Sequence, residues 1–146
     1  MSRFDERAKD WDKKHVSLEK SEACIKHLKN NIDFKNIKNI LDYGCGTGLI
    51  AFDLVEKNNQ VLGLDSSNGM VEEFNKKAKD KNLTNIKAKK HDILNDDLGE
   101  NCFDLIVISM SLHHIENPAI FFEKSFNAIS NLPSAADIFS KYCFAG

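Results

Sequence analysis

A turn with glycine at every second position constrains this chain more than any other feature of its sequence. Residues 42–48 read Asp-Tyr-Gly-Cys-Gly-Thr-Gly, preceded by a largely apolar run over residues 37–41 and followed by Leu-Ile-Ala-Phe. This pattern predicts a strand that enters the turn and a helix that leaves it. Glycine removes the Cβ atoms that would hold the backbone away from a ligand, and it permits the positive φ angles of a tight turn. The turn is therefore predicted to lie against a small molecule.

The spacing of the glycines limits which ligand this is. A dinucleotide-binding turn needs glycine at the position of Leu49, and a phosphate-binding P-loop needs lysine after Gly48. The carboxylate of Asp42 would repel a phosphate and would attract an ammonium group. A pyrophosphate ligand, and with it a dinucleotide-dependent oxidoreductase, is disfavoured.

Apolar residues alternate along the chain between strand-like and helix-like spacing. Strands are predicted over residues 37–42, 60–65, 85–90 and 103–110, and helices over residues 47–57, 68–81 and 118–131. Two further helices, over residues 4–14 and 16–32, precede the first strand. Residues 92–102 are polar and are predicted to form a loop or a single turn. Strands separated by helices imply right-handed crossovers and a parallel sheet with helices on both faces, which is an α/β fold.

Composition favours a small or neutral partner. The chain has 146 residues, 42% of them hydrophobic, which fits one globular domain. Its formal charge of -2, with Lys and Arg scattered, indicates neither nucleic acid nor a membrane surface as a partner. No stretch approaches the length of a membrane span, and the charged N-terminus differs from a signal peptide.

The four cysteines predict a cytoplasmic protein with reduced thiols. Cys24, Cys45, Cys102 and Cys143 lie far apart and lack C-x-x-C spacing. This spacing indicates neither a zinc site nor a disulfide framework, and no metal is expected.

The segment 42–48 resembles motif I, D/E-x-G-x-G-x-G, of the class I S-adenosylmethionine-dependent methyltransferases. The resemblance implies a Rossmann-like, doubly wound, mostly parallel sheet of strand order 3-2-1-4, with S-adenosyl-L-methionine as the cofactor. It also implies that Asp42 and the Gly44 carbonyl hold the methionine ammonium, directly or through water. The motif residues assigned to cofactor binding are Asp42, Gly44, Cys45, Gly46 and Gly48.

The second strand is predicted to end in another cofactor residue, Asp65. An acid at the carboxyl end of this strand lies beside the crevice where α/β sheets bind ligands, and it can accept both ribose hydroxyls. Ser66 follows it, and Met70 offers an apolar face to a purine ring. Ser67 or Asn68 is expected to cap the next helix. The alternative is that Asp65 is only a turn residue.

The third strand is predicted to end at the adenine. The resemblance assigns an acid here, Asp92, to the exocyclic amine of adenine, and the backbone amide of Ile93 to a ring nitrogen. The preceding His91 is predicted to point to the surface.

The fourth strand leads into two adjacent histidines. Ser109 and Met110 can present backbone carbonyls to the methionine part of the cofactor, while His113 or His114 orients or deprotonates the nucleophile. Imidazole suits this task because its ordinary pKa lies near neutrality. The alternative for one of the pair is a capping or packing role, because adjacent side chains do not both enter one pocket from regular structure.

The N-terminal segment resembles the lid helix of methyltransferases of ubiquinone and menaquinone biosynthesis. The resemblance rests on Phe4, Arg7, Ala8 and Trp11. It implies that Phe4 and Trp11 close over the cofactor and exclude water. Packing in the core is the alternative for both aromatic rings.

The C-terminal tail departs from the family. Only Leu132 and Pro133 match the expected Leu-Lys-Pro-Gly-Gly turn, and the family's last three strands are missing. We expect residues 132–146 to form a helix over the exposed edge of the fourth strand, or that edge to form a homodimer. The expected division of the single domain 1–146 is N-terminal lid helices over 1–34, a cofactor-binding core over 35–131 and this tail.

The sequence therefore predicts a methyltransferase that transfers a methyl group from S-adenosyl-L-methionine to a small-molecule acceptor. The alternative is a non-catalytic S-adenosylmethionine-binding protein, or a truncated half-domain that acts with a partner chain.

Overall fold

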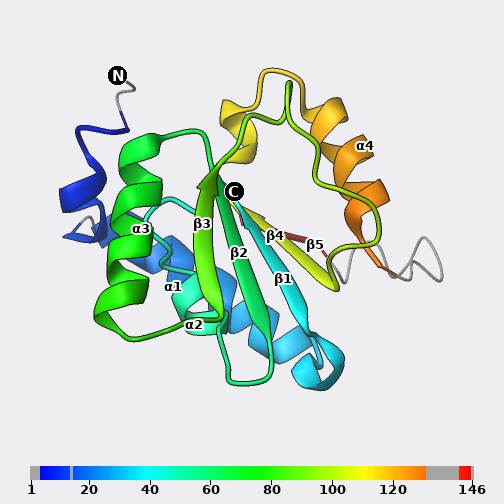
Figure 1. Ribbon diagram of the computed structural model, residues 1–146, viewed down its shortest axis with the longest axis horizontal. Coiled ribbons are helices and arrows are strands. Elements are labelled where there is room, and N and C mark those ends of the chain that lie inside the picture. Colours follow the sequence, from blue (N-terminus) through cyan, green and yellow to red (C-terminus); the bar gives the residue numbers. More distant parts are fainter. Residues whose placement is uncertain (1–3, 14, 131–141, 146) are drawn as a thin grey trace.

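A parallel sheet forms the centre of the computed structural model (Figure 1). The structure describes residues 4–13 and 15–130, and the backbone of residues 142–145. Within these residues the sheet has five strands in the order β3-β2-β1-β4-β5. The strands are β1 Asn39–Tyr43, β2 Gln60–Asp65, β3 Ile86–Lys90, β4 Leu105–Ser109 and β5 Tyr142–Ala145. The predicted order 3-2-1-4 is confirmed, with β5 added beside β4.

The strand β5 corrects the expectation of a helical tail. Residues 142–145 run parallel to β4, with Ile106 opposite Tyr142 and Ser109 opposite Ala145. The edge of β4, through which the homodimer was predicted, is therefore paired within the chain, and β5 forms the edge of the sheet on this side. The rest of the tail, including Leu132 and Pro133, lies outside the described residues.

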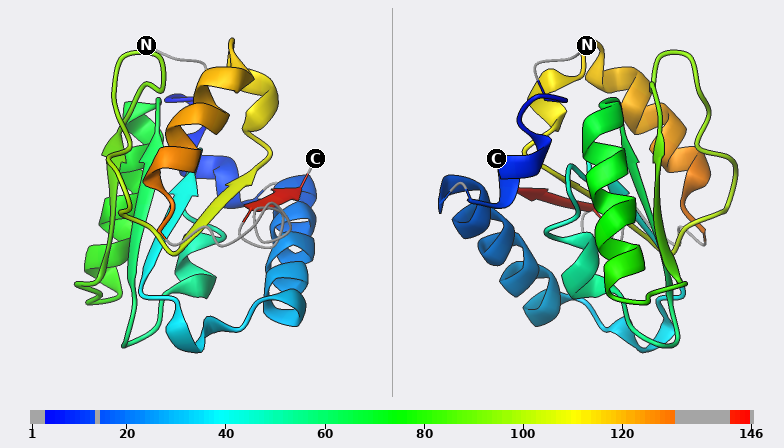
Figure 2. Two further views of the ribbon diagram at one scale, coloured as in Figure 1. Left: turned by 90° about the vertical axis from the view of Figure 1, so that its right-hand side faces the viewer. Right: turned by 60° about the vertical axis from the view of Figure 1, so that its left-hand side comes forward.

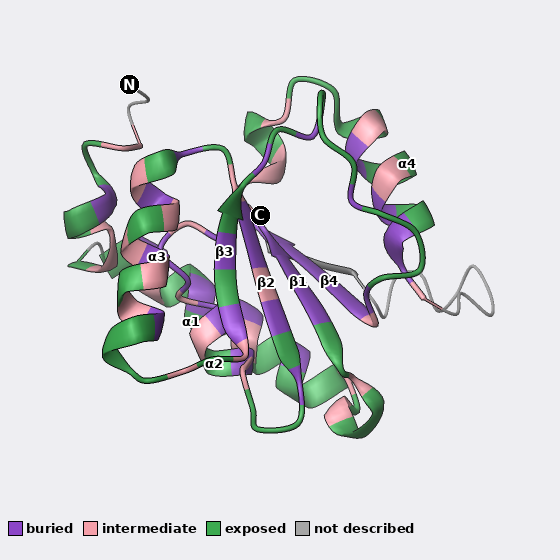
Figure 3. Ribbon diagram, viewed as in Figure 1, coloured by how far each residue is buried: buried purple, intermediate pink, exposed green. Residues whose placement is uncertain are grey.

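Helices cover both faces of the sheet (Figure 2). One face packs against α1 His15–Asn31, α2 Ala51–Leu54 and α3 Asn68–Asp80, and the other against α4 Pro118–Ala128. Within the described residues, three short 3₁₀ helices precede or follow these elements, namely η1 Ala8–Lys13, η2 Phe34–Asn36 and η3 Leu112–His114. Central β4 is buried along its whole length (Figure 3), as expected for a parallel strand covered on both faces.

Two predicted helices differ from the observed elements. Where a helix was predicted over residues 47–57, α2 has only four residues, because the glycine turn continues through Gly48, which has a φ of 93°. The segment predicted as a helix over residues 4–14 is a turn followed by the 3₁₀ helix η1. Both are short elements, in which tertiary contacts outweigh intrinsic helix preference.

Candidate functional site

A cavity of about 390 Å³ lies at the carboxyl ends of the strands. Its wall is formed by the glycine turn, the segments that follow β2, β3 and β4, helix α1 and the N-terminal segment. Most residues predicted for the site line it, namely Asp42, Gly44, Cys45, Gly46, Asp65, Ser66, Met70, Asp92, Ile93, Ser109 and His114. Gly48 and His113 do not.

The glycine turn is held against β2 and against the segment after β4. The backbone N–H groups of Gly44 and Cys45 both donate to the carbonyl of Leu64, at 2.7 and 3.1 Å. A Cβ at Gly44 would lie 2.1 Å from the Oγ atom of Ser111, and Gly44 has a φ of 69°. Glycine is therefore required here for conformation and for the close approach of Ser111.

Gly48 and Cys45 attach the turn to the core. A Cβ at Gly48 would lie 2.7 Å from ring atoms of Phe52 and Phe74, so Gly48 packs against these two rings and not in the cavity wall. Burial raises the pKa of the Cys45 thiol well above its ordinary value, and its Sγ atom packs where a Cβ of Gly63 would lie. A thiol in this setting stays protonated.

Asp42 is a buried carboxylate at the start of the turn. Its side chain is 2% exposed, and its Oδ2 atom has no hydrogen-bond partner among the described residues. Burial is the main cause that raises the pKa of Asp42 to about 7. A hydrogen bond from the backbone of Ala51 lowers this pKa, and the nearby charge of Asp65 raises it. An ionised carboxylate in this position favours a cationic partner.

Asp65 ends β2 and faces the same cavity. It accepts hydrogen bonds from the backbone N–H groups of Gly46 and Ser67, both at 2.9 Å. Burial raises the pKa of Asp65 despite these bonds, and the charge of Asp5 adds to the increase. Asp42 and Asp65 thus give the cavity a negative wall.

Helix α3 begins beside Asp65. The Ser67 hydroxyl accepts the N–H of Met70 at 3.2 Å, so of the two predicted caps Ser67 is the one observed. Buried Met70 lines the cavity, and its Sδ atom lies 4.0 Å from the position of a Cβ on Gly46. The first turn of α3 thus places an apolar side chain in the cavity wall.

His91 is buried, and the prediction that it points to the surface is wrong. It is 7% exposed, and its Nδ1 atom lies 3.5 Å from the hydroxyl of Tyr43 while its Nε2 atom lies 3.3 Å from the carbonyl of Asp97. The alternation of β3 directs Lys87, Lys89 and His91 to one face of the sheet. Both lysines are exposed there, but the loop after β3 covers His91.

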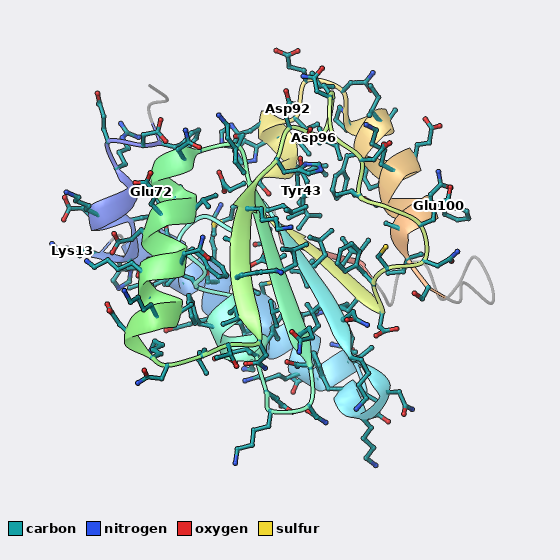
Figure 4. The ribbon with its side chains drawn as sticks, viewed as in Figure 1. Lys13, Tyr43, Glu72, Asp92, Asp96 and Glu100 are labelled. Carbon is teal, nitrogen blue, oxygen red and sulfur yellow. The ribbon has the colours of Figure 1, made fainter. Side chains whose placement is uncertain are left out.

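Asp92 holds the turn that follows β3 (Figure 4). Its Oδ1 atom accepts the N–H of Leu94 at 3.0 Å, its Oδ2 atom accepts the side-chain amide of Asn95 at 2.7 Å, and its own N–H donates to Asp96. The hydrogen bond from Leu94 is the main cause that lowers the pKa of Asp92. Asp92 and buried Ile93 both line the cavity.

The segment after β4 carries an unusual backbone angle. Met110 has a φ of 58°, a region that few residues other than glycine adopt. Ser109 is buried, and its Oγ atom has no partner among the described residues. Both residues line the cavity, so the strained backbone lies at its wall.

The two histidines occupy different environments. His114 lines the cavity, and its ring lies 5.3 Å from the ring of Phe4 at an angle of 69°. The ring of His113 lies 4.0 Å from that of His114 but not in the cavity wall. Of the pair, His114 is therefore the candidate for contact with a bound molecule.

The N-terminal segment brings two aromatic rings to the cavity. Phe4 and Trp11 both line it, with ring centroids 6.0 Å apart, and Ala8 between them is buried. The indole Nε1 atom of Trp11 lies 3.7 Å from the position of a Cβ on Gly46. Trp11 therefore lies against the glycine turn, while Phe4 lies between Trp11 and His114 in the cavity wall.

Several wall residues were missed by the sequence analysis, among them Ser21, Tyr43, Ser111, Ile115 and Glu116. Tyr43 stands inside the glycine motif and was the one with a usable signal. Ser21 belongs to α1, far from the motif in sequence. In the described parts of the chain, no cluster of three potential metal ligands occurs, and no helix is long and apolar enough to cross a membrane.

Sequence comparisons relate this geometry to known proteins. Residues 40–131 match the family model of a methyltransferase domain. An uncharacterized methyltransferase of Schizosaccharomyces pombe is 37% identical over 95 residues, which cover 60% of this chain and 34% of that protein. The ubiquinone biosynthesis O-methyltransferase of Coxiella burnetii is 26% identical over 123 residues, which cover 81% of this chain and 51% of that protein. The chain thus spans about a third to a half of these relatives.

Solved structures show the same fold. A candidate S-adenosyl-L-methionine-dependent methyltransferase from Methanococcus maripaludis superposes with a TM-score of 0.74 at 25% identity, over 90% of this chain and 62% of that one. A methyltransferase from Aquifex aeolicus gives a TM-score of 0.70 at 21% identity, over 86% of this chain and 67% of that one. The chain therefore belongs to the methyltransferase domain family, and its fold is that of the class I enzymes whose cofactor is S-adenosyl-L-methionine.

Proposed function

We propose that this chain binds S-adenosyl-L-methionine in the cavity and transfers its methyl group to a small-molecule acceptor. The observation that carries the proposal is the buried carboxylate of Asp42, whose Oδ2 atom has no partner among the described residues. Asp65 adds a second carboxylate to the same wall. A cofactor with an ammonium and a sulfonium group suits this negative wall, because a buried carboxylate is stable when it is paired with a cation.

In this proposal, the wall residues bind different parts of the cofactor. Asp42 and the Gly44 carbonyl hold the methionine ammonium, and Asp65 holds the ribose hydroxyls. Asp92 and the amide of Ile93 bind the adenine, although both carboxylate oxygens of Asp92 also accept bonds within their own turn. Each oxygen has a second lone pair for an amine. Met70 provides apolar contact for the purine.

The reaction asks mainly for alignment. When bound, the cofactor supplies a methyl group that its sulfonium has already activated, so the acceptor has to be held in line with it at short range. Phe4 and Trp11 exclude water from this part of the cavity. His114 orients the acceptor or takes its proton, because of the two adjacent histidines it is the one that lines the cavity.

A small acceptor is consistent with the charge and with the relatives. The formal charge of -2 gives no excess of basic residues for nucleic acid. The Coxiella burnetii relative is a ubiquinone biosynthesis O-methyltransferase. Cofactor binding without catalysis, or a half-domain that needs a partner chain, is not favoured, because the family and these relatives are methyltransferases.

Calorimetric titration with S-adenosylhomocysteine tests cofactor binding. We expect micromolar binding by the wild-type chain and its loss in Asp65→Ala, with Asp80→Ala as the matched control, since Asp80 is exposed at the other end of α3. A wild-type chain that is folded by circular dichroism but does not bind would contradict the proposal. Equal binding by Asp65→Ala would contradict the ribose assignment alone.

The assignment of His114 is tested by a matched pair of variants. In a screen of small acceptors that detects S-adenosylhomocysteine formation, His114→Gln is expected to lower kcat at least tenfold, the lower range for general acid-base catalysis being about a hundredfold. His113→Gln is expected to leave kcat nearly unchanged, because its ring lies outside the cavity wall. Equal losses in both variants would show that the pair acts only through packing.

A further inference from the structure

Two carboxylates of the N-terminal segment reach the loops that form the cavity. Asp5 contacts the start of α3, just after β2, and Asp12 contacts the glycine turn, just after β1. In Figures 1 and 2 this segment lies beside α3. The sequence analysis gave neither residue a role.

Asp5 completes the N-terminal cap of α3. Its Oδ1 atom accepts the Ser67 hydroxyl at 2.6 Å and the backbone N–H of Gly69 at 2.8 Å. Ser67 in turn caps Met70, so two orphan groups of the helix end are bound by a chain of side chains that begins at Asp5. A carboxylate is favoured at this end of a helix.

Gly69 is shaped for the same contact. A Cβ at Gly69 would lie 2.8 Å from the Cα atom and 2.9 Å from the carbonyl oxygen of Asp5. Gly69 is the second residue of α3 and does not have a positive φ angle. Its backbone conformation therefore does not itself require glycine. The glycine is needed because the backbone of the N-terminal segment packs there.

Asp12 forms the second attachment. Its carboxylate accepts the Thr47 hydroxyl and the ammonium group of Lys77. Lys77 also donates to the carbonyl of Thr47 at 3.0 Å, and Thr47 is 1% exposed. The three side chains thus join the N-terminal segment, the glycine turn and α3 at one point.

Each attached carboxylate stands next to an aromatic residue of the cavity wall. Phe4 precedes Asp5 and Trp11 precedes Asp12. Fixing the two carboxylates therefore fixes where both rings lie. Phe4 also contacts the ring of His114, which lies after β4. The attachments of Asp5 and Asp12 therefore also affect where Phe4 meets His114.

We propose that Asp5 and Asp12 are positioning residues that latch residues 4–13 over the cofactor cavity and so set how long the cofactor stays bound. This inference rests on the proposed function, whose cofactor occupies that cavity. With both attachments formed, a ligand beneath Phe4 and Trp11 leaves only after the segment has lifted. Loss of one attachment raises the fraction of time that the segment is open, and with it the dissociation rate.

Stopped-flow fluorescence measures this rate, because Trp11 is the single tryptophan of the chain. Bound S-adenosylhomocysteine is displaced with excess S-adenosylmethionine while Trp11 emission is recorded. Asp5→Asn and Asp12→Asn are each expected to raise the dissociation rate about tenfold or more, the factor that loss of a charge-assisted hydrogen bond implies. Unchanged rates in both variants would overturn the proposal.

Asp10→Asn is the matched control. Asp10 lies in the same segment but is exposed and forms an ion pair with Lys13, also exposed. Its substitution changes the charge of the segment equally and is expected to leave the dissociation rate within about twofold, since exposed ion pairs contribute little. A tenfold increase in the dissociation rate of Asp10→Asn would show that the overall charge of the segment causes the effect, and it would contradict the proposed latch.

Quenching of Trp11 by acrylamide tests the latch without any ligand. Asp12→Asn and Gly69→Ala are expected to raise the quenching constant at least twofold. Circular dichroism and the thermal midpoint check that both variants remain folded. If the wild-type chain fails to bind S-adenosylhomocysteine but these variants increase quenching, the proposed function fails and the attachment of the segment stands. If quenching is unchanged in both folded variants, the latch is wrong whatever the cofactor result.

Discussion

Asp42 shows how one residue of the site acts against the stability of the fold. Its carboxylate is buried, and burial is the main cause that raises its pKa to about 7. In the unfolded chain the pKa returns to about 3.9. Between these values the folded protein binds a proton that the unfolded chain does not. The free energy of unfolding therefore increases as the pH falls through 7, and this gain is complete only near pH 4.

Urea unfolding of the ligand-free protein at pH 6 and at pH 5 tests this sign. From pH 6 to pH 5, Asp42 is expected to contribute a gain of about 1.4 kcal/mol, the value of one proton per pH unit. Asp42→Asn removes the titrating group and keeps its shape, so it is expected to lose this part of the pH dependence. An identical pH dependence in both proteins would show that Asp42 does not titrate in this range.

The site residues that belong to a sequence motif were predictable. Those that reach the cavity only through packing between distant segments were not. Asp42 and Asp65 follow from the glycine motif and from the end of the second strand, and both line the cavity. His91 was misplaced because alternation predicts a face but not what covers it. Ser21 lacked any signal, since only the packing of α1 brings it to the wall.

The elements were predicted best where hydrophobic periodicity is long and bounded. The bounds of β2 are those predicted, and α3 begins at the predicted residue after its cap. Strand β5 was not predicted, because four residues carry little periodicity and their pairing with β4 is non-local. The turn geometry of Gly48 likewise shortened α2 in a way that apolar spacing does not reveal.

Removal of β5 tests its role as an element. Deletion of residues 142–146 exposes the backbone N–H and C=O groups of β4, a template for pairing with another chain. We expect a lower urea midpoint and concentration-dependent association in light scattering. Deletion of Gly146 alone leaves the strand intact and is the control. A truncated chain that stays monomeric with an unchanged midpoint would show that β5 does not stabilise the sheet.

At the scale of the whole molecule, parallel strands gather the site at one end. The carboxyl ends of β1, β2, β3 and β4 meet there, as expected for ligand sites of open α/β sheets. The core lies on both sides of the sheet below this end, and the strands reach the cavity wall only with their last one or two residues, such as Tyr43, Asp65 and Ser109. Variation of the loops and of the N-terminal segment can therefore change the acceptor without changing the core.

The order of the chain gives the N-terminal segment a late place in folding. Asp5 is separated by 62 residues from Ser67, and Asp12 by 35 residues from Thr47. Such contacts close long loops, which costs chain entropy that only an already formed sheet and helix α3 can offset. Residues 4–13 are thus synthesised before the sheet and α3 and yet are expected to dock after them. For the same reason the segment can detach while the sheet stays folded, as a local unfolding unit of its own.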